Sequence, residues 1–548
     1  MMRKELYIKK IRYSNLACIV LIIVCFFAIV WKCIAGFDID EQYSYSMMYR
    51  ILDGTIPIVE MYDSFQFSAL LASPVYWISM QLSAYYSVFI TRILSVIIYF
   101  ILSYKIYRFC IQQTKNGVIS YLTALTIIIV LPKSSLTLDH SNMLKFMLAY
   151  IVIDLYSYLK DEHNHRYWLW IALEHSIMSL CYPTLILLGF AIIFIFLLRK
   201  DYSYMFRYVA CGIFIAFTIV FPIITNSGIK PFLDGLKMIA SDGSHGLSFA
   251  DELFQIKNDL YYAAKYCIAY FAMFLIVLIL KRAFQKKTII KGIDSFSLAY
   301  IAPFIATCFQ HILTIASALA GYIRFLFLAI LGFFDNRIKK QEEDFIIWAF
   351  SLMAFVIICL SSNNGVHENS GYCISLLPFI VIKLNSAKTQ WTTLFLLLLT
   401  IITSQFCNFI MSVKVSGSRP SGIRSFELVS DNLSIGTILI EPHSKKMFDE
   451  LVDKKELINT DYVTVLSEQS YCYNLIHKHV FAPVTTSTPH YDSQWYSYFK
   501  DNQIKELVVI NDVGFSKGNE FINYLKSNYS VVLVHETSDL EIYKLSMY

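Results

Sequence analysis

Long apolar segments, separated by short polar ones, run through the chain up to about residue 413. Each segment is close to the roughly 20 residues that a helix needs to cross a bilayer, so the pattern predicts about thirteen membrane-spanning helices. They are expected near 15–35, 86–104, 117–133, 142–159, 167–181, 183–198, 205–225, 262–280, 296–315, 317–334, 344–360, 371–384 and 391–411. Residues 65–83 are apolar but contain Gln, Ser and Pro, which favours an interfacial or re-entrant helix over a further span.

The pattern changes after residue 413. Residues 414–426 are basic and contain Gly, Ser and Pro, which is typical of a linker. Beyond the linker, the strand-like runs TILIE, YVTVL, ELVVIND and SVVLVHE alternate with the helix-like runs KKMFDELVDK, SYCYNLIHKH, SQWYSYFKDN and NEFINYLKSN. Such alternation predicts a small α/β domain. The sequence therefore predicts an α-helical polytopic membrane domain over 1–413 and an α/β domain over 414–548.

The distribution of positive charge predicts the orientation. Lys and Arg gather in residues 1–14 and in segments such as KRAFQKK at 281–287 and RIKK at 337–340. Because cytoplasmic loops carry the excess of these residues, the N-terminus is expected in the cytoplasm and the first loop, 36–85, outside. An odd number of spans then places the C-terminal α/β domain outside too. We expect a multi-pass protein of the plasma (inner) membrane.

Composition supports this class. Hydrophobic residues make up 56% of the chain and charged residues 16%, whereas a soluble domain carries roughly 25% charged residues. The net charge of +5 is spread over short loops, so no nucleic-acid partner is expected. The 12 Cys include no C-x-x-C pair, which argues against a structural zinc site or a redox motif.

Acidic residues gather in the first loop. The stretch GFDIDEQYSYSMMYRILDGTIPIVEMYD at 36–63 includes Asp40, Glu41 and Asp63. Because charges are costly in hydrocarbon, such a cluster beside a span either sits in water or serves a site. Arg92 and Arg324 lie within apolar segments, where an ionisable residue also indicates a role.

This loop resembles the first loop of GT-C glycosyltransferases, and more narrowly that of the protein mannosyltransferase and lipid A aminoarabinose transferase group. There an Asp-Glu pair precedes an aromatic residue, a Gly, a Pro and a second Asp. The matching residues here are Asp40, Glu41, Tyr43, Gly54, Pro57 and Asp63. The resemblance continues through Arg92 into LTLDHSNMLKFMLAY, where Asp139 matches the second acidic position. It covers about the first 160 residues. The chain departs from the group after Asp63, where Ser64-Phe65-Gln66 replaces a frequent His-Pro-Pro.

The resemblance implies transfer of a sugar from a polyprenyl-phosphate donor to a protein, a lipid-linked glycan or a cell-envelope polymer outside the membrane. An acceptor activated by a base would displace the lipid phosphate and invert the anomeric centre. The resemblance implies Asp40 as the base with Glu41 beside it, Asp63 and Asp139 as an acceptor or second acidic site, and Arg92 as a phosphate ligand. From their places in the sequence, His140 joins Asp139 at the second site, Arg324 is a second candidate phosphate ligand, and His367 and Glu368 are candidate sugar contacts.

Each of these residues also has a structural explanation. Asp40 and Asp63 can cap following helices, and Glu41 can be a helix-start charge. Asp139 with His140 can form a solvated turn, Arg92 can pair with a first-loop carboxylate, Arg324 can belong to a buried ion pair, and His367 with Glu368 can form a polar turn. No cofactor is required, and a hard divalent cation held by Asp38, Asp40, Glu41 and Asp139 is an alternative.

Two other functions stay open. A polysaccharide polymerase or O-antigen ligase would have similar spans, but its key Arg and His usually lie in a large later loop. The long loop expected at 226–261 contains one His, His245. A lipid-linked sugar flippase or transporter would favour charges midway through spans and repeated halves.

Overall fold

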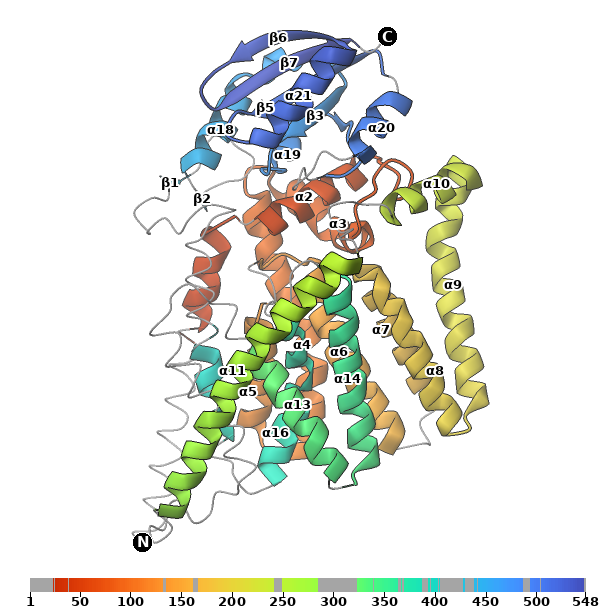
Figure 1. Cartoon of the computed structure of the whole chain (residues 1–548), viewed down its shortest axis with the longest axis vertical. Coiled ribbons are helices and arrows are strands. Elements are labelled where there is room, and N and C mark those ends of the chain that lie inside the picture. The colour runs from red at the N-terminus through yellow and green to blue at the C-terminus, as the bar shows by residue number, and fades with distance from the viewer. Residues whose placement is uncertain are drawn as a thin grey trace.

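The computed structural model describes residues 23–283, except 24, 38, 132–134, 161–165 and 241–248. It also describes residues 323–546, except 339, 363–365, 367–368, 387–392, 395, 403, 405–426, 429–437, 441, 486–492 and 503. Figure 1 shows a bundle of helices with the C-terminal domain at one end. The predicted span near 296–315 lies outside the described residues, as do the candidate sugar contacts His367 and Glu368.

Helices build most of the described chain. A first helix, Cys25–Ile34, leads to those of the bundle and its loops. They are α2 (Ile39–Leu52), α3 (Gln66–Leu82), α4 (Ser87–Thr114), α5 (Gly117–Ile129), α6 (His140–Lys160), α7 (Tyr167–Cys181), η1 (Pro183–Leu187), α8 (Leu188–Leu198), α9 (Tyr202–Ser227), α10 (Ile229–Ala240), α11 (Phe249–Ala283), α13 (Ile323–Ile338), α14 (Glu342–Leu360), η3 (Ser370–Leu376) and α16 (Leu377–Ser386).

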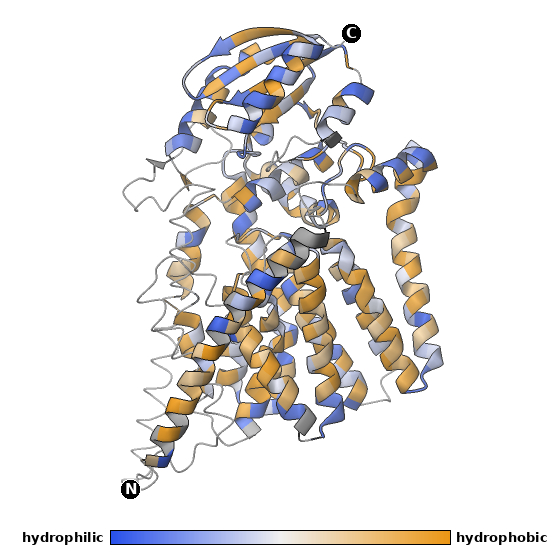
Figure 2. Cartoon of the chain, viewed as in Figure 1, coloured by the Kyte–Doolittle hydropathy of each residue, from blue (hydrophilic) through white to orange (hydrophobic). Residues whose placement is uncertain are grey.

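Three of the described helices, α4, α9 and α14, are long and apolar enough to cross a membrane. Shorter apolar helices accompany them, among them α5 and the η1–α8 segment. Figure 2 shows that hydrophobic residues dominate these helices, whereas polar residues are common in the C-terminal domain. The chain is therefore an integral membrane protein. The predicted count of about thirteen spans and the orientation stay predictions.

Helix boundaries follow local sequence signals. α4 ends where Lys115 adopts a left-handed φ of 54°, and the Asn116 side chain then accepts a hydrogen bond from the Ile119 N–H (3.1 Å) and caps α5. α7 coincides with the span expected at 167–181. α11 differs from expectation, because it begins at Phe249 and takes in the segment DELFQIKNDL, which the sequence assigns to a loop.

The C-terminal domain is α/β, as predicted. Its helices are α18 (Pro442–Asp453), η5 (Lys455–Leu457), α19 (Cys472–Ile476), α20 (Ser493–Asp501) and α21 (Ser516–Asn528). Its strands are β1 (Glu427–Leu428), β2 (Leu439–Ile440), β3 (Tyr462–Leu466), β4 (His479–Val480), β5 (Glu506–Asp512), β6 (Ser530–Glu536) and β7 (Leu540–Ser546). β4, β3, β5, β7 and β6 form one sheet in that order, with β4 and β5 parallel to β3 and β7 antiparallel to β5 and β6.

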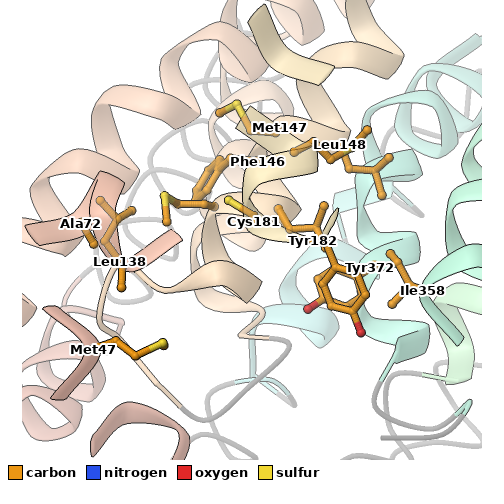
Figure 3. Close-up of a cluster of buried hydrophobic side chains, with 14 of the residues drawn as sticks. Met47, Ala72, Leu138, Phe146, Met147, Leu148, Cys181, Tyr182, Ile358 and Tyr372 are labelled. Carbon is orange, nitrogen blue, oxygen red and sulfur yellow. The ribbon is translucent and has the colours of Figure 1, made fainter. Parts of the chain in front are cut away.

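The apolar core of the bundle reaches up to α2. Figure 3 shows Met47 from α2, Ala72 from α3 and Phe146 from α6 in one cluster that extends to Tyr182 and Tyr372. These side chains are almost fully buried. α2 and α3 therefore lie on the end of the bundle rather than crossing it, and α2 lies between the bundle and the C-terminal domain (Figure 1).

The C-terminal domain is joined to the start of the chain. The Gly36 N–H donates to the Leu439 carbonyl in β2 (3.0 Å). On α2, the Gln42 amide donates to Gln469 (2.8 Å), and the Ser46 hydroxyl donates to the Ser470 carbonyl (2.8 Å). Buried polar groups are satisfied in pairs across this contact, which fixes the register of α2 against the domain.

Candidate active site at the first loop

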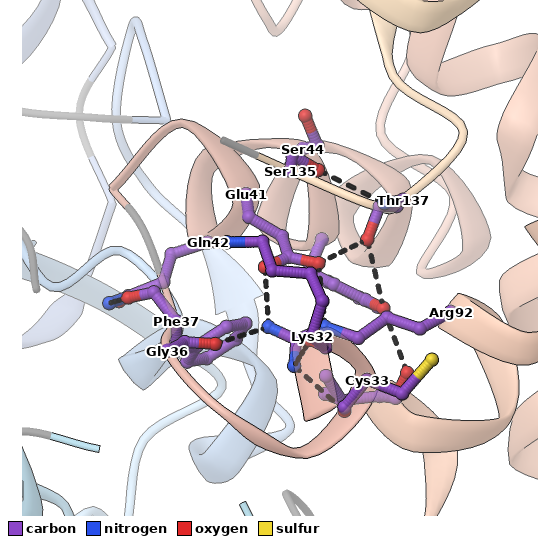
Figure 4. A network of polar contacts seen from close by, with 12 residues as sticks. Lys32, Cys33, Gly36, Phe37, Glu41, Gln42, Ser44, Arg92, Ser135 and Thr137 are labelled. Atoms are coloured by element: carbon purple, nitrogen blue, oxygen red, sulfur yellow. Dashed lines mark hydrogen bonds and ion pairs between the residues drawn. The ribbon is translucent and has the colours of Figure 1, made fainter. Parts of the chain in front are cut away.

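Glu41 forms a buried ion pair with Arg92. The Arg92 Nε donates to Glu41 Oε1 (2.9 Å) and Nη2 donates to Oε2 (2.5 Å), so the contact is bidentate. The Thr137 hydroxyl also donates to Oε1 (2.5 Å). Figure 4 shows this network at the start of α2, with Arg92 projecting from α4. Bidentate, charge-assisted bonds of this kind fix the geometry of both side chains.

The remaining donors of Arg92 bind carbonyl groups. Nη1 donates to the carbonyls of Lys32 (3.2 Å) and Cys33 (2.9 Å), and Nη2 also donates to that of Gly36 (2.5 Å). The five N–H groups of a guanidinium are thus all engaged. Arg92 makes the ion pair with a first-loop carboxylate, and its role in holding the donor phosphate stays a prediction.

Asp139 is the second acidic residue at this place. Its Oδ1 accepts from the Ser141 hydroxyl and the Asn142 N–H (both 2.8 Å). Its Oδ2 is buried and receives no hydrogen bond from the described residues. Burial raises the pKa of Asp139 to about 6; the two hydrogen bonds oppose the shift, and the negative charges of Asp40 and Glu41 add to it. Asp139 therefore lies near both first-loop carboxylates.

Asp40 lies on the first turn of α2, directly before Glu41. It is partly exposed, whereas Glu41 is buried. The structure thus brings together three of the predicted residues, Asp40, Glu41 and Asp139, and leaves Asp40 the most accessible of them. This arrangement suits a base that must reach an acceptor from outside.

The second loop is held rigidly beneath α2. The Asn142 amide donates to the carbonyls of Ser135 (3.0 Å) and Thr137 (3.1 Å). The Tyr99 hydroxyl donates to the same Thr137 carbonyl (2.6 Å), and the Leu138 N–H donates to Ser95 on α4 (3.0 Å). Because these bonds reach α4 and α6, Asp139 has a fixed place relative to Arg92 and Glu41.

Asp63 lies at the junction with the C-terminal domain. Its carboxylate accepts from the Thr485 N–H (2.9 and 3.1 Å), from the Thr485 hydroxyl (2.7 Å) and from the Tyr43 hydroxyl (2.9 Å). Burial raises the pKa of Asp63, while Arg50 (Nη1 to Oδ2, 3.7 Å) and these hydrogen bonds lower it. Asp63 thus links the first loop to the domain, and its contact with an acceptor stays a prediction.

The loop between α2 and α3 holds one strained residue. Ile58 has a φ of 70°, a conformation that β-branched residues rarely adopt. Its N–H donates to the Gln66 side chain (2.7 Å). Its carbonyl lies against Gly235 of α10, where a Cβ would be 1.7 Å from the oxygen. Strain of this kind persists only where the surroundings impose it, and it is common at functional sites.

His140 lies in an aromatic stack. Its ring is parallel to that of Phe65, with centroids 4.0 Å apart, and the Phe65 ring lies 5.3 Å from that of Tyr182. Pro183 follows Tyr182 and lines a cavity of about 510 Å³ between α7, η1, α8 and α9. The site is therefore close to a sizeable cavity.

The cavity is lined mainly by apolar side chains. Phe67 of α3 contributes to one part, and the exposed Ile186 and Phe190 contribute to its outer edge. The polar pair His175 and Tyr208, with 2.8 Å between Nδ1 and the hydroxyl, lies in its wall. Its volume and apolar lining suit part of a hydrocarbon chain.

Arg324 is fully buried on α13. Its Nη2 donates to the Ser404 hydroxyl (3.2 Å), and the guanidinium lies over the Phe325 ring (5.0 Å). Its role as a phosphate ligand stays a prediction.

Lys145 is a buried charge that the sequence analysis does not single out. Its ammonium donates to the Val130 carbonyl (2.7 Å) and lies over the rings of Tyr99 and Phe146. Lys145 lies on α6, which begins directly after Asp139, and the charges of the two residues interact. The signal was available, because a lysine inside an apolar segment indicates a role in the same way as Arg92.

The described residues contain no group of three or more His, Cys, Asp or Glu arranged to hold a metal ion. Asp38 lies outside the described residues, and Glu41 is engaged by Arg92 and Thr137. A divalent cation at this place would have Asp40 and the open oxygen of Asp139 as its ligands on the described chain.

The sequence matches none of the known protein-family models and none of the curated proteins. Among solved structures, the chain is similar to the crystal structure of ArnT from Cupriavidus metallidurans in the apo state. The identity is 10% and the TM-score is 0.43, over 97% of this chain and 98% of that one. At this identity and TM-score, the roles of residues here are inferred from the chain itself.

Proposed function

We propose that the protein is a membrane glycosyltransferase that moves a sugar from a polyprenyl-phosphate donor to an acceptor on the outer face of the membrane. The observation that supports this most is that Asp40 and Asp139 lie close enough for their charges to interact. One carboxylate is partly exposed, and the other is buried with an unused oxygen among the described residues. A pair of carboxylates in different environments is suited to taking and holding protons.

In the proposed reaction, Asp40 takes the proton from the acceptor hydroxyl. The acceptor oxygen then forms a bond to the anomeric carbon, while the bond from that carbon to the phosphate oxygen breaks and its electron pair leaves with the phosphate. This displacement inverts the anomeric centre. Glu41, held by Arg92, fixes the start of α2 and so the position of Asp40. Asp139 stands beside the base as a second acceptor of hydrogen bonds from the substrate.

The donor is assigned to the side of the bundle with the apolar cavity. Its prenyl chain would occupy the cavity near Phe67 and Pro183, and its phosphate would face the positive groups of the bundle. Arg324 is the proposed phosphate ligand, because developing negative charge on the leaving phosphate needs a cation. The acceptor, a protein, a lipid-linked glycan or a cell-envelope polymer, would enter from the side of the C-terminal domain. This proposal places that side outside the cell membrane.

The test is sugar release from a panel of radiolabelled polyprenyl-phosphate sugars by purified protein in detergent. Wild type should turn over one donor, and Asp40→Asn should lower the rate by about 100-fold or more, the scale of losing a general base. Asp53→Asn is the matched control. Asp53 lies at the other end of the same loop helix and pairs with His479, so its change should leave the rate near that of wild type.

Full activity of Asp40→Asn would show that Asp40 is not the base. If folded wild type releases sugar from none of the donors, the proposed donor class is wrong, and a polymerase using diphosphate-linked glycans or a transporter becomes the better explanation.

A further inference from the structure

A second charged cluster lies inside the bundle, away from the first loop. Lys105 of α4 donates to Asp154 of α6, with 2.8 Å between Nζ and Oδ2, and to Glu174 Oε1 of α7. The two carboxylate oxygens share one ammonium nitrogen. They therefore lie within about two hydrogen-bond lengths of each other.

Both carboxyl groups are buried. Asp154 is 5% exposed and Glu174 is 4% exposed. At roughly 1.5 Å per residue, they lie about 10 Å inside the ends of α6 and α7 that are remote from the C-terminal domain. The cluster is therefore inside the helical bundle and not at its rim.

The charges of the cluster do not balance if both carboxyls are ionised. One ammonium then faces two carboxylates, and Glu174 Oε2 is buried without a hydrogen bond from any described residue. An uncompensated carboxylate in such surroundings keeps the desolvation penalty of a buried ion. A proton bound by the two carboxyls removes the excess charge.

Among the described ion pairs, Lys105 is the cation that contacts Asp154 and Glu174. His175, the next residue on α7, contacts the Tyr208 hydroxyl and the Leu185 carbonyl instead. Tyr150, whose ring lies 4.5 Å from the Lys105 ammonium, is neutral. The charged groups on neighbouring helices have other described contacts: Lys160 and Arg199 pair with Glu343, Lys383 pairs with Asp335, Arg207 lies over Trp168, and Arg108 donates to Tyr104.

We propose that Asp154 and Glu174 bind one proton between them at neutral pH, so that the Lys105–Asp154–Glu174 cluster is a neutral proton-binding site. Lys105 compensates one carboxylate, and the shared proton compensates the other. The Lys105 side chain is partly exposed, whereas both carboxyl groups are buried. This inference is independent of the proposed glycosyltransferase activity.

Infrared spectroscopy of the purified full chain tests the proposal. The carbonyl stretch of a protonated carboxyl group is separate from the bands of carboxylates. Wild type at neutral pH should show a protonated-carboxyl band that Glu174→Gln and Asp154→Asn each remove, because either change leaves one carboxylate with one ammonium. Lys105→Met should instead increase the band by one carboxyl group, because both acids must then be neutral.

Asp139→Asn serves as a control, since it removes any band from the first-loop site and should leave that of the cluster. Thermal unfolding establishes that each variant is folded. If both acid variants keep the wild-type band, or Lys105→Met adds none, the proposal is overturned. It is also overturned if wild type shows no such band at neutral pH; a melting temperature that added sodium then raises for wild type but not for Glu174→Gln would identify the bound cation as a metal ion.

Discussion

The change Arg92→Lys separates the two roles predicted for Arg92. A lysine keeps the positive charge, so it can still attract a phosphate. It cannot reproduce the planar fork that binds both oxygens of Glu41 together with three carbonyl groups. If the ion pair is the main role, the variant should lose stability.

The loss follows from the contacts. Arg92 has five donors in use, whereas an ammonium group has three. Each lost hydrogen bond that involves a charged group is worth roughly 1.5–3 kcal/mol, so losing two of them predicts a destabilisation of about 3–6 kcal/mol. This range overlaps the usual cost of breaking a buried ion pair, about 3–5 kcal/mol.

The free energy of unfolding in mixed detergent, followed by tryptophan fluorescence, measures this loss. Arg108→Lys is the matched control on the same helix. Arg108 is exposed, and its described hydrogen bond is to the Tyr104 hydroxyl (3.1 Å), so the change should alter the unfolding free energy by less than about 0.5 kcal/mol.

One combination of results would refute the reasoning. If Arg92→Lys unfolds within about 1 kcal/mol of wild type but binds the donor far more weakly, Arg92 acts on the phosphate. The ion pair with Glu41 would then contribute little to folding, contrary to the magnitude worked out from its contacts.

Three further changes test other contacts. The pKa of Asp139 is about 6 in the folded chain and about 3.9 when unfolded, so the folded state holds the proton more tightly. Wild type should therefore gain about 1 kcal/mol of stability when the pH falls from 7 to 5. Unfolding measurements on Asp139→Asn should lack this gain. Thr485→Val should speed hydrogen exchange in α2, since it removes a buried hydroxyl donor, whereas Thr485→Ser should not. Gly332→Ala should lower the stability of the folded protein by about 1–3 kcal/mol in melting experiments, because the added Cβ would lie 2.1 Å from the Trp348 ring. Gly212 has open space around it, so Gly212→Ala should leave the stability unchanged.

Much of the helical architecture could be predicted from the sequence. The helix expected at 167–181 is α7, because its apolar run is closed by a proline two residues later. α11 is the counterexample. Its first part carries charged residues among apolar ones, and periodicity alone does not distinguish such a helix from a polar loop.

The α/β class of the C-terminal domain could be predicted from the sequence, but not all of its strands could. The strands β3, β5 and β6 follow the predicted runs, since each is an unbroken stretch of β-branched and aliphatic residues. β4 has two residues and carries no signal of its own. β7 is not among the predicted strands, although its sequence LEIYKLS alternates between apolar and polar residues, the period-two pattern of a half-buried strand.

The residues of the site could be predicted from the sequence, but the partner that each of them contacts could not. Sequence places Asp40, Glu41 and Asp139 near the same face of the membrane, but the partner of each depends on tertiary packing. Arg92 reaches Glu41 across 51 positions, and Thr485 reaches Asp63 across 422. No local pattern encodes such distances, so the structural and functional explanations of these residues could not be separated beforehand.

The two neighbouring acids of α2 illustrate why the separation matters. Successive residues on a helix point roughly 100° apart, so Asp40 and Glu41 cannot face the same surroundings. Glu41 is buried and engaged by Arg92 and Thr137, whereas Asp40 is partly exposed. A buried ion pair is weak evidence for stability as such, and its consequence here is geometric. By fixing Glu41, Arg92 fixes the rotation of α2 about its axis, and that rotation decides where Asp40 stands relative to Asp139. A change at Arg92 should therefore impair the reaction through the position of Asp40, even where the charge of Arg92 never meets the donor.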